Sequence, residues 1–343
     1  MKAAVISVRL AGNSMMKQSA GASRTAVNVA LLRALHAEDG EPKIFNDYLA
    51  GKLVTPEERA DFESIVVASL ELFRSETDIS SLTPVSRLRQ SLNATTTQDL
   101  LITRARFTED HLLKCVERGV SQYVILGAGL DTFALRRPDL QDRLTVFEVD
   151  HPATQESKRA RLRAARLACP PNLHFLPADF ERENVVEVLR RSPYRTDRAA
   201  FFSWSGVTYY LAAEIVFGVL RSIRGIAAPG SCVAFDYLDL DAFDPFKVSA
   251  RIRVIMERVR QIGEPMITGF DPDHLPAKLA EVGFHVVEGL GPEEQRSRYF
   301  SGRRDGFTAP EHCHLVLAEA GHLRPSHFTD LPPSTPPPRG RSI

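Results

Sequence analysis

The chain is poor in the features that mark disulfide-bonded and metal-binding proteins. It has four cysteines in 343 residues, and no two of them form a Cys-x-x-Cys pair. Wide spacing of this kind is typical of reduced thiols in the cytosol. We therefore expect a cytoplasmic protein with reduced cysteines, namely Cys115, Cys169, Cys232 and Cys313.

An excess of one charge is also lacking. Lys plus Arg and Asp plus Glu each number 43, so the formal net charge is zero. This balance argues against a nucleic-acid partner, and we interpret the basic residues at 158–166 as the solvated face of a helix. No apolar run reaches about 18 residues, and residues 1–16 lack a sustained apolar core. We expect neither a membrane partner nor a signal peptide.

The most informative stretch lies at residues 122–150. One apolar run ends in Gly127-Ala128-Gly129, and a second ends in Asp150. A strand that turns on glycines into a helix lets backbone N–H groups approach a ligand. An acid at the tip of the next strand, about 20 residues further on, can bind both hydroxyls of a ribose. Glu148 shares a side of that strand with Asp150, so either acid could serve. The stretch predicts an adenosine-containing cofactor.

The glycine pattern lacks the third glycine that a dinucleotide site prefers, because Thr132 stands there. Asp131 lies where a phosphate would approach, and its carboxylate would repel an anion. S-adenosylmethionine has no phosphate and carries a sulfonium and an ammonium group, which suit an acid. The residues therefore favour S-adenosylmethionine over NAD.

Several segments, in order over about residues 20–320, resemble the leucine carboxyl methyltransferase-like family of S-adenosylmethionine-dependent methyltransferases. That family includes bacterial O-methyltransferases of secondary metabolism. The matching segments are Phe-Asn-Asp (45–47), Arg-Ala-Arg-Phe-Thr-Glu-Asp (104–110), Val-Ile-Leu-Gly-Ala-Gly-Leu-Asp-Thr (124–132), Phe-Glu-Val-Asp-His-Pro (147–152), Ala-Asp-Phe (178–180) and Ser-Gly-Val-Thr-Tyr-Tyr-Leu (205–211).

The resemblance assigns roles to particular residues around the cofactor. It implies that Asp150 binds the ribose, that Asp179 binds the adenine amino group and that Phe180 covers the ring or donates its N–H. Asp179 could also be a helix N-cap, and the two roles are compatible. One arginine of the 104–110 segment would bind the cofactor's carboxylate, and between Arg104 and Arg106 we favour Arg106. The family usually carries Glu where this chain has Ser205.

The pattern of strands and helices predicts an α/β fold. We expect strands near 122–127, 144–149, 173–177, 199–204, 231–238, 284–289 and 312–319, with helices at 152–168, 181–191 and 212–227. Such alternation implies a doubly wound, Rossmann-like seven-stranded sheet that is mostly parallel. The return at 291–310 has no clear helix, which suits an antiparallel last strand, as the resemblance also implies.

Around this core we expect a flexible N-terminus (1–20), an N-terminal helical lid (21–120) and a methyltransferase core (121–320). The core carries a helical insertion at 240–280, and a Pro-rich disordered tail follows at 321–343. His312 and His314 would share a strand face, but no third ligand lies near them in the sequence, so we predict a structural strand and no metal site.

The predicted function is O-methyl transfer to a hydroxyl or carboxyl group of a small molecule. Four histidines are candidate bases, but the sequence assigns none of them: His36, His111, His151 and His274. Three alternatives stay open. The chain could methylate a protein C-terminus, or bind the cofactor without turnover, as the loss of Glu at Ser205 suggests. An NAD-dependent oxidoreductase is the third.

Overall fold

A computed structural model describes residues 24–39, 42–72, 83–180, 183–261 and 264–321. The predicted flexible N-terminus and all but the first residue of the predicted tail lie outside these ranges. The described chain opens with four helices: α1 (Arg24–Asp39), α2 (Pro56–Leu72), α3 (Pro84–Thr95) and α4 (Gln98–Glu117). α2 begins with a proline followed by two acids, which suit the positive end of a helix. The division into lid and core stays a prediction.

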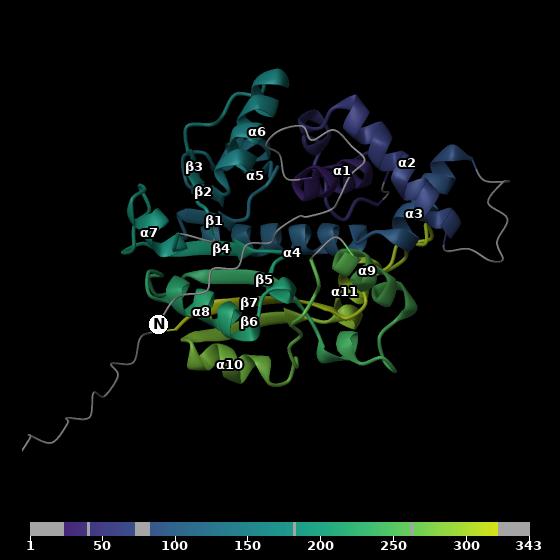
Figure 1. Cartoon of the computed structure of the whole chain (residues 1–343). Helices are drawn as coiled ribbons and strands as arrows, with labels where there is room; N and C mark the ends of the chain where they lie inside the picture. The colour runs from purple at the N-terminus through teal and green to yellow at the C-terminus, as the bar shows by residue number, and fades with distance from the viewer. Residues whose placement is uncertain (1–23, 40–41, 73–82, 181–182, 262–263, 322–343) are drawn as a thin grey trace, which may run out of the picture.

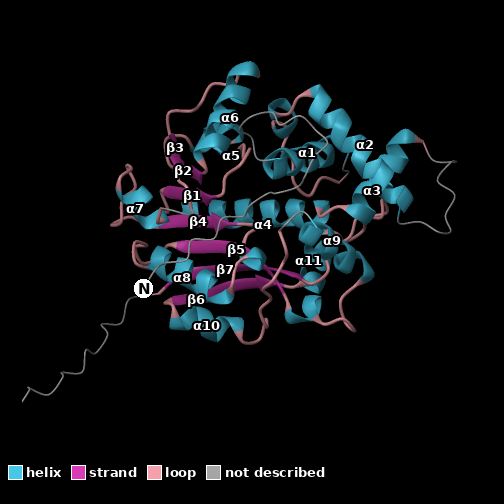
Figure 2. Cartoon of the chain, in the orientation of Figure 1, coloured by secondary structure: helices cyan, strands magenta, loops and turns pink. Residues whose placement is uncertain are grey.

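Seven strands form one sheet in the order β3-β2-β1-β4-β5-β7-β6, seen as a ladder in Figure 2. The first five strands pair in parallel, and β7 pairs antiparallel with both β5 and β6. The predicted fold and the antiparallel last strand are therefore confirmed. The strands are β1 (Gln122–Leu126), β2 (Thr145–Asp150), β3 (Leu173–Pro177), β4 (Ala200–Trp204), β5 (Cys232–Leu238), β6 (Phe284–Leu290) and β7 (Cys313–Ala320).

The connecting helices correct two details of the prediction. The return between β6 and β7 contains a helix, α11 (Pro292–Tyr299). The sequence did not predict it, because its many charged residues leave no apolar pattern. α7 begins at Val185 rather than at 181, because Asn184 caps it by accepting a hydrogen bond from the Val186 N–H. The other connecting helices are α5 (Phe133–Arg136), α6 (Pro152–Ala164), α8 (Ala213–Arg224), α9 (Ala250–Gln261) and α10 (Leu275–Glu281).

The core lies on both faces of the sheet. Alternate residues of β1 enter different clusters: Val124 packs beneath α7 and α8, and Tyr123 packs beneath α4. All residues of β1, β4 and β5 are buried, which is why these central strands read as continuous apolar runs. The edge strand β6 instead alternates between buried and exposed positions.

α4 runs alongside the strands, and α1, α2, α3 and α9 gather at one end of the sheet (Figure 1). The residues that follow β1, β2, β4 and β5 lie at this end, because the parallel strands share one direction. Across the described ranges, no helix combines the length and apolar character that crossing a bilayer requires.

Candidate active site

The glycine turn after β1 adopts a backbone that suits glycine. Gly127 and Gly129 have φ values of +73° and +54°, in the left-handed region. A side chain on Gly127 would meet nothing within 4 Å, so this residue faces open space. The expected free N–H donors are used within the fold: Gly127 donates to the Val149 carbonyl and Gly129 to Asp150. Close approach of a ligand therefore depends on the missing side chain rather than on free donors.

Asp150 lies directly beside this turn, at the end of β2. Its Oδ2 accepts from the Gly129 N–H and its Oδ1 from the His151 N–H. A carboxylate has about four lone-pair positions, so roughly two remain for ligand hydroxyls. Burial raises the pKa of Asp150, although the two backbone donors oppose that shift. The structure thus brings together the glycines and the acid that the sequence singled out.

Glu148, the second acid of β2, points elsewhere. Its carboxylate lies 2.5 Å from Lys158 Nζ of α6, and both side chains are at most 2% exposed. Burial raises the pKa of Glu148 to about 7, and Asp131 and Asp150 add to the rise while Lys158 opposes it. The interpretation of Lys158 as part of a solvated helix face is therefore wrong, because its ammonium group is buried against Glu148.

Asp131 and Asp179 sit in the loops after β1 and β3. Asp131 Oδ1 accepts from the Phe133 N–H, at the start of α5. The end of β3 joins that of β2 through a hydrogen bond from Ala178 N to the Asp150 carbonyl. The next residue, Asp179, is half-buried, and Phe180 is 37% exposed. Both therefore follow β3 at the end of the sheet where Asp150 lies.

The two arginines of α4 face different surroundings. Arg106 is 46% exposed, pairs with Asp110 and donates to the Ile44 carbonyl. The Arg104 side chain is only 13% exposed, and its Nη1 lies 3.3 Å from Asp236 Oδ2 and 3.4 Å from the Tyr209 hydroxyl. Two positions along a helix differ by about 200° in direction, so the pair cannot share one target. Arg104 therefore faces the ends of β4 and β5, whereas the favoured Arg106 faces the surface.

Asp236 is the residue that the sequence reasoning missed. It lies within β5, is fully buried and accepts a hydrogen bond from the Gly206 N–H at 2.6 Å. Its carboxylate raises the pKa of Arg104, which burial alone would lower. An aspartate inside an otherwise apolar strand was the available signal, because a buried charge needs a partner.

Gly206 explains how Arg104 fits between the strand ends. Its φ is +77°, and a Cβ there would lie 2.5 Å from Arg104 Nη1. Ser205, which precedes it, follows β4 directly and is half-buried. Extension of the β4–β5 register, in which Trp204 pairs with Phe235, places Ser205 beside Asp236. A carboxylate is therefore present next to position 205, on the neighbouring strand.

Another buried acid, Asp47, ties the N-terminal helices to the loop that follows β1. Asp47 is 1% exposed and binds Arg33 of α1 at 2.8 Å and the Thr132 hydroxyl at 2.6 Å. Burial alone would raise the pKa of Asp47, but Arg33 and Arg136 hold it below its usual value. Arg33 also donates to the Leu130 carbonyl. α1 is thereby fixed over the loop that follows β1.

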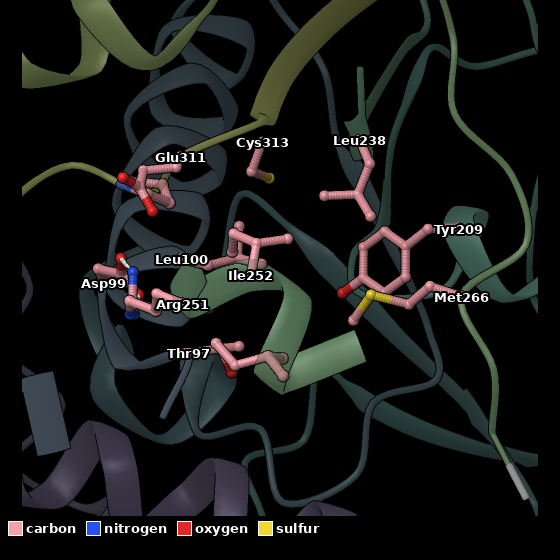
Figure 3. Close-up of a pocket in the computed structure, with 12 residues that line it drawn as sticks. Thr97, Asp99, Leu100, Tyr209, Leu238, Arg251, Ile252, Met266, Glu311 and Cys313 are labelled. Carbon is pink, nitrogen blue, oxygen red and sulfur yellow. Dashed lines mark hydrogen bonds and ion pairs between the residues drawn. The ribbon is translucent and has the colours of Figure 1, made fainter. Parts of the chain in front are cut away.

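A small pocket lies next to Arg104, between the start of α4, the end of β5 and α9 (Figure 3). Asp99 and Arg251 form an ion pair on one side, and Tyr209 and Met266 lie on the other. Tyr209 connects the pocket to Arg104 through its hydroxyl. The remaining lining is largely apolar: Thr97, Leu100, Leu238, Ile252, Ile255, Pro310, Glu311 and Cys313.

The candidate bases lie away from this pocket, since no histidine is among its lining residues. His36 accepts from the Ile44 N–H, His111 faces Glu288, His151 caps α6 and His274 pairs with Asp271. His312 and His314 both contact Asp239, at 3.0 and 3.2 Å. Within the described residues, no group of three or more His, Cys, Asp or Glu side chains is arranged to hold a metal ion.

Comparison with known proteins gives consistent matches. The family model described as leucine carboxyl methyltransferase matches residues 26–224. A Bacillus subtilis protein, YktD, named as a candidate S-adenosyl-L-methionine-dependent methyltransferase, is 32% identical over 296 residues, which cover 86% of this chain and 97% of that protein. A similarly named Mycolicibacterium smegmatis protein is 30% identical over 290 residues, which cover 84% of this chain and 89% of that protein.

Among solved structures, a DUF574 family protein from Streptomyces avermitilis aligns with a TM-score of 0.50 at 14% identity. The alignment covers 88% of this chain and 98% of that protein. At this identity the likeness concerns the fold, and it agrees with the seven-stranded sheet.

Proposed function

Because this chain belongs to the leucine carboxyl methyltransferase family and is an S-adenosylmethionine-dependent methyltransferase, we propose that it transfers the methyl group to an oxygen of a small, largely apolar molecule. The observation that carries this proposal is the position of the apolar pocket. It adjoins Tyr209 and Arg104 at the same end of the sheet as the glycine turn and Asp150.

The cofactor fits the residues at this edge. We assign the ribose hydroxyls to Asp150, which retains acceptor capacity, and the open space above the turn to Gly127. Gly129 shapes the turn, and a Cβ there would lie 3.2 Å from the Cβ of Ala26. Asp179 and Phe180, after the neighbouring strand, would hold the adenine, and Asp131 would attract the cationic groups. For the carboxylate we propose Arg104 rather than Arg106, because its side chain is only 13% exposed and lies against the ends of β4 and β5.

When bound, S-adenosylmethionine supplies an electrophilic methyl group for an in-line displacement. The task of the protein is then to align an acceptor oxygen behind that methyl group and to exclude water. Tyr209 and Met266 form the wall of the pocket beside Arg104, and Ile252 of α9 closes it. The two carboxylates that line the pocket are engaged, Asp99 by Arg251 and Glu311 by Ser249. Because no histidine lines the pocket and both carboxylates are engaged, we propose an acceptor that needs no base, such as a carboxylate.

A direct test follows methyl transfer from isotopically labelled S-adenosylmethionine to a panel of apolar hydroxy compounds and carboxylic acids. Mild alkali releases methanol from methyl esters and leaves methyl ethers intact, so the product identifies the acceptor group. Labelled product that is lost in Asp150→Ala supports the proposal. Labelling of protein C-termini alone would favour the protein carboxyl methyltransferase.

Ser205 supports one competing proposal, in which the chain binds the cofactor without turnover. The family usually carries Glu at this position, and Ser205 lacks that charge. Cofactor binding with no labelled product, either from the small molecules or from protein C-termini, would favour this regulatory role. We further propose that the enzyme works in the cytoplasm, in secondary metabolism, with a small-molecule acceptor rather than a nucleic acid or a membrane as its partner. Its four free cysteines accord with the cytoplasmic assignment.

A further inference from the structure

Two cysteines that lie far apart in the sequence meet in the structure. Cys115 is in the last turn of α4, and Cys232 is the first residue of β5. Their sulfurs are 3.6 Å apart although 117 positions separate them, and both residues are at most 1% exposed. The widely spaced cysteines of the sequence therefore include one pair of thiols in van der Waals contact.

A surface arginine covers this pair. Arg118 Nη2 lies 3.4 Å from the Cys115 sulfur and 3.5 Å from that of Cys232, and it also contacts Glu319. The Arg118 side chain is 54% exposed, so the two sulfurs lie one layer below the solvent. Arg118 is thus one side chain that separates the two sulfurs from the solvent.

The electrostatic surroundings make the two thiols unequal. The hydrogen bond with Cys232 and the charge of Arg118 lower the pKa of Cys115 to about 7, against the effect of burial. The same hydrogen bond and burial raise the pKa of Cys232. Cys115 is therefore the sulfur that loses its proton more readily, and the thiolate is the reactive form of cysteine.

We propose that Cys115 and Cys232 are an oxidisable pair, at which a peroxide closes a disulfide between α4 and β5. The Cys115 thiolate attacks the peroxide, an S–O bond forms, the O–O bond breaks, and hydroxide leaves. The Cys232 thiol then attacks the oxidised sulfur, an S–S bond forms, the S–O bond breaks, and water leaves with the thiol proton. Two thiols and one hydrogen peroxide give one disulfide and two waters, so the sulfurs lose the two electrons that the peroxide gains.

The disulfide would join two elements that already meet at the active site. Arg104 and Asp236 already link α4 to β5. Arg104 lies eleven residues before Cys115, and Asp236 lies four residues after Cys232. The helix and the strand therefore run in opposite directions. These separations correspond to about 16 Å of helix and about 13 Å of strand. The loop that the bond closes contains Gly127, Asp150 and Ser205, so oxidation would constrain the unfolding of most of the candidate site.

The test uses the full chain with Cys169→Ser, which removes the exposed cysteine and with it disulfides between molecules. The protein is treated with hydrogen peroxide, alkylated after unfolding and digested for mass spectrometry. We expect a peptide cross-linked through Cys115 and Cys232, reversed by dithiothreitol, with Cys313 still alkylated. Cys313 is the internal control, because it is equally buried and burial raises its pKa. The oxidised form should melt roughly 5–10 °C higher.

Full alkylation of Cys115 and Cys232 after peroxide treatment would overturn the proposal, as would equal oxidation of Cys313. An unchanged or lower melting temperature of the cross-linked form would contradict the inference that the fold already holds both sulfurs in place. In Cys232→Ser, a sulfenic acid should persist at Cys115 and react with dimedone. None of these readouts depends on the cofactor or the acceptor, so they stand apart from the test of methyl transfer.

Discussion

Replacement of Arg104 should remove the group that binds the cofactor's carboxylate. A charge-assisted hydrogen bond contributes about 1.5–3 kcal/mol, so Arg104→Met should weaken S-adenosylhomocysteine binding roughly 10- to 150-fold. Arg106→Met is the matched control: its exposed pair with Asp110 contributes about 0.3–0.5 kcal/mol to stability, and we expect a change within about twofold. Isothermal titration calorimetry measures both constants.

Loss of Arg104 also leaves Asp236 buried without its cation, which costs about 3–5 kcal/mol of stability. The double variant Arg104→Met/Asp236→Asn should regain part of that stability while its affinity stays low. A second ligand distinguishes the loss of carboxylate binding from a general loss of folding. 5′-Methylthioadenosine keeps the nucleoside but lacks the carboxylate, so its affinity should not depend on Arg104. Equal weakening of both ligands by Arg104→Met, or a greater loss in Arg106→Met, would refute the assignment.

Three further results are expected. Gly206→Ala should weaken S-adenosylhomocysteine binding in calorimetry, because the new Cβ would lie 2.5 Å from Arg104 Nη1 at a φ of +77°. As the pH rises from about 4.5 to about 7, the free energy of unfolding of the wild type in urea should fall relative to that of Glu148→Gln, because burial raises the pKa of Glu148 in the folded state. Asp47→Ala should cost about 3–5 kcal/mol in the same assay, because it leaves Arg33 buried without its carboxylate, and a loss below about 1 kcal/mol would contradict this role.

Much of the fold was predictable from local patterns. The central strands are buried on both faces and read as short apolar runs, and the glycine turn marks where β1 ends. The helix α11 was not predictable in the same way, because only Gln295 of its eight residues is buried, so it lacks an apolar stripe. Its helical character depends on the proline and acids at its start.

The site was predictable where the chain itself brings residues together, and less so where packing decides. Asp150 and Gly129 meet because adjacent parallel strands end at the same edge. The choice between Arg104 and Arg106 depends on which face of α4 packs on the sheet, and the motif holds both residues. Lys158 reads as one of several helix charges until Glu148 is found opposite it. Such pairings are contacts over distance, which a single sequence does not record.

The measurement that tests the central claim most directly is calorimetric titration with S-adenosylhomocysteine, run beside NADH. The account predicts that the wild-type chain binds S-adenosylhomocysteine and not NADH, and that Asp150→Ala weakens binding at least about tenfold. Asp139→Ala, which removes an exposed acid that pairs with Arg137, should bind like the wild type. Binding of NADH in preference, or an Asp150→Ala variant that is folded and binds S-adenosylhomocysteine as tightly as the wild type, would contradict the account.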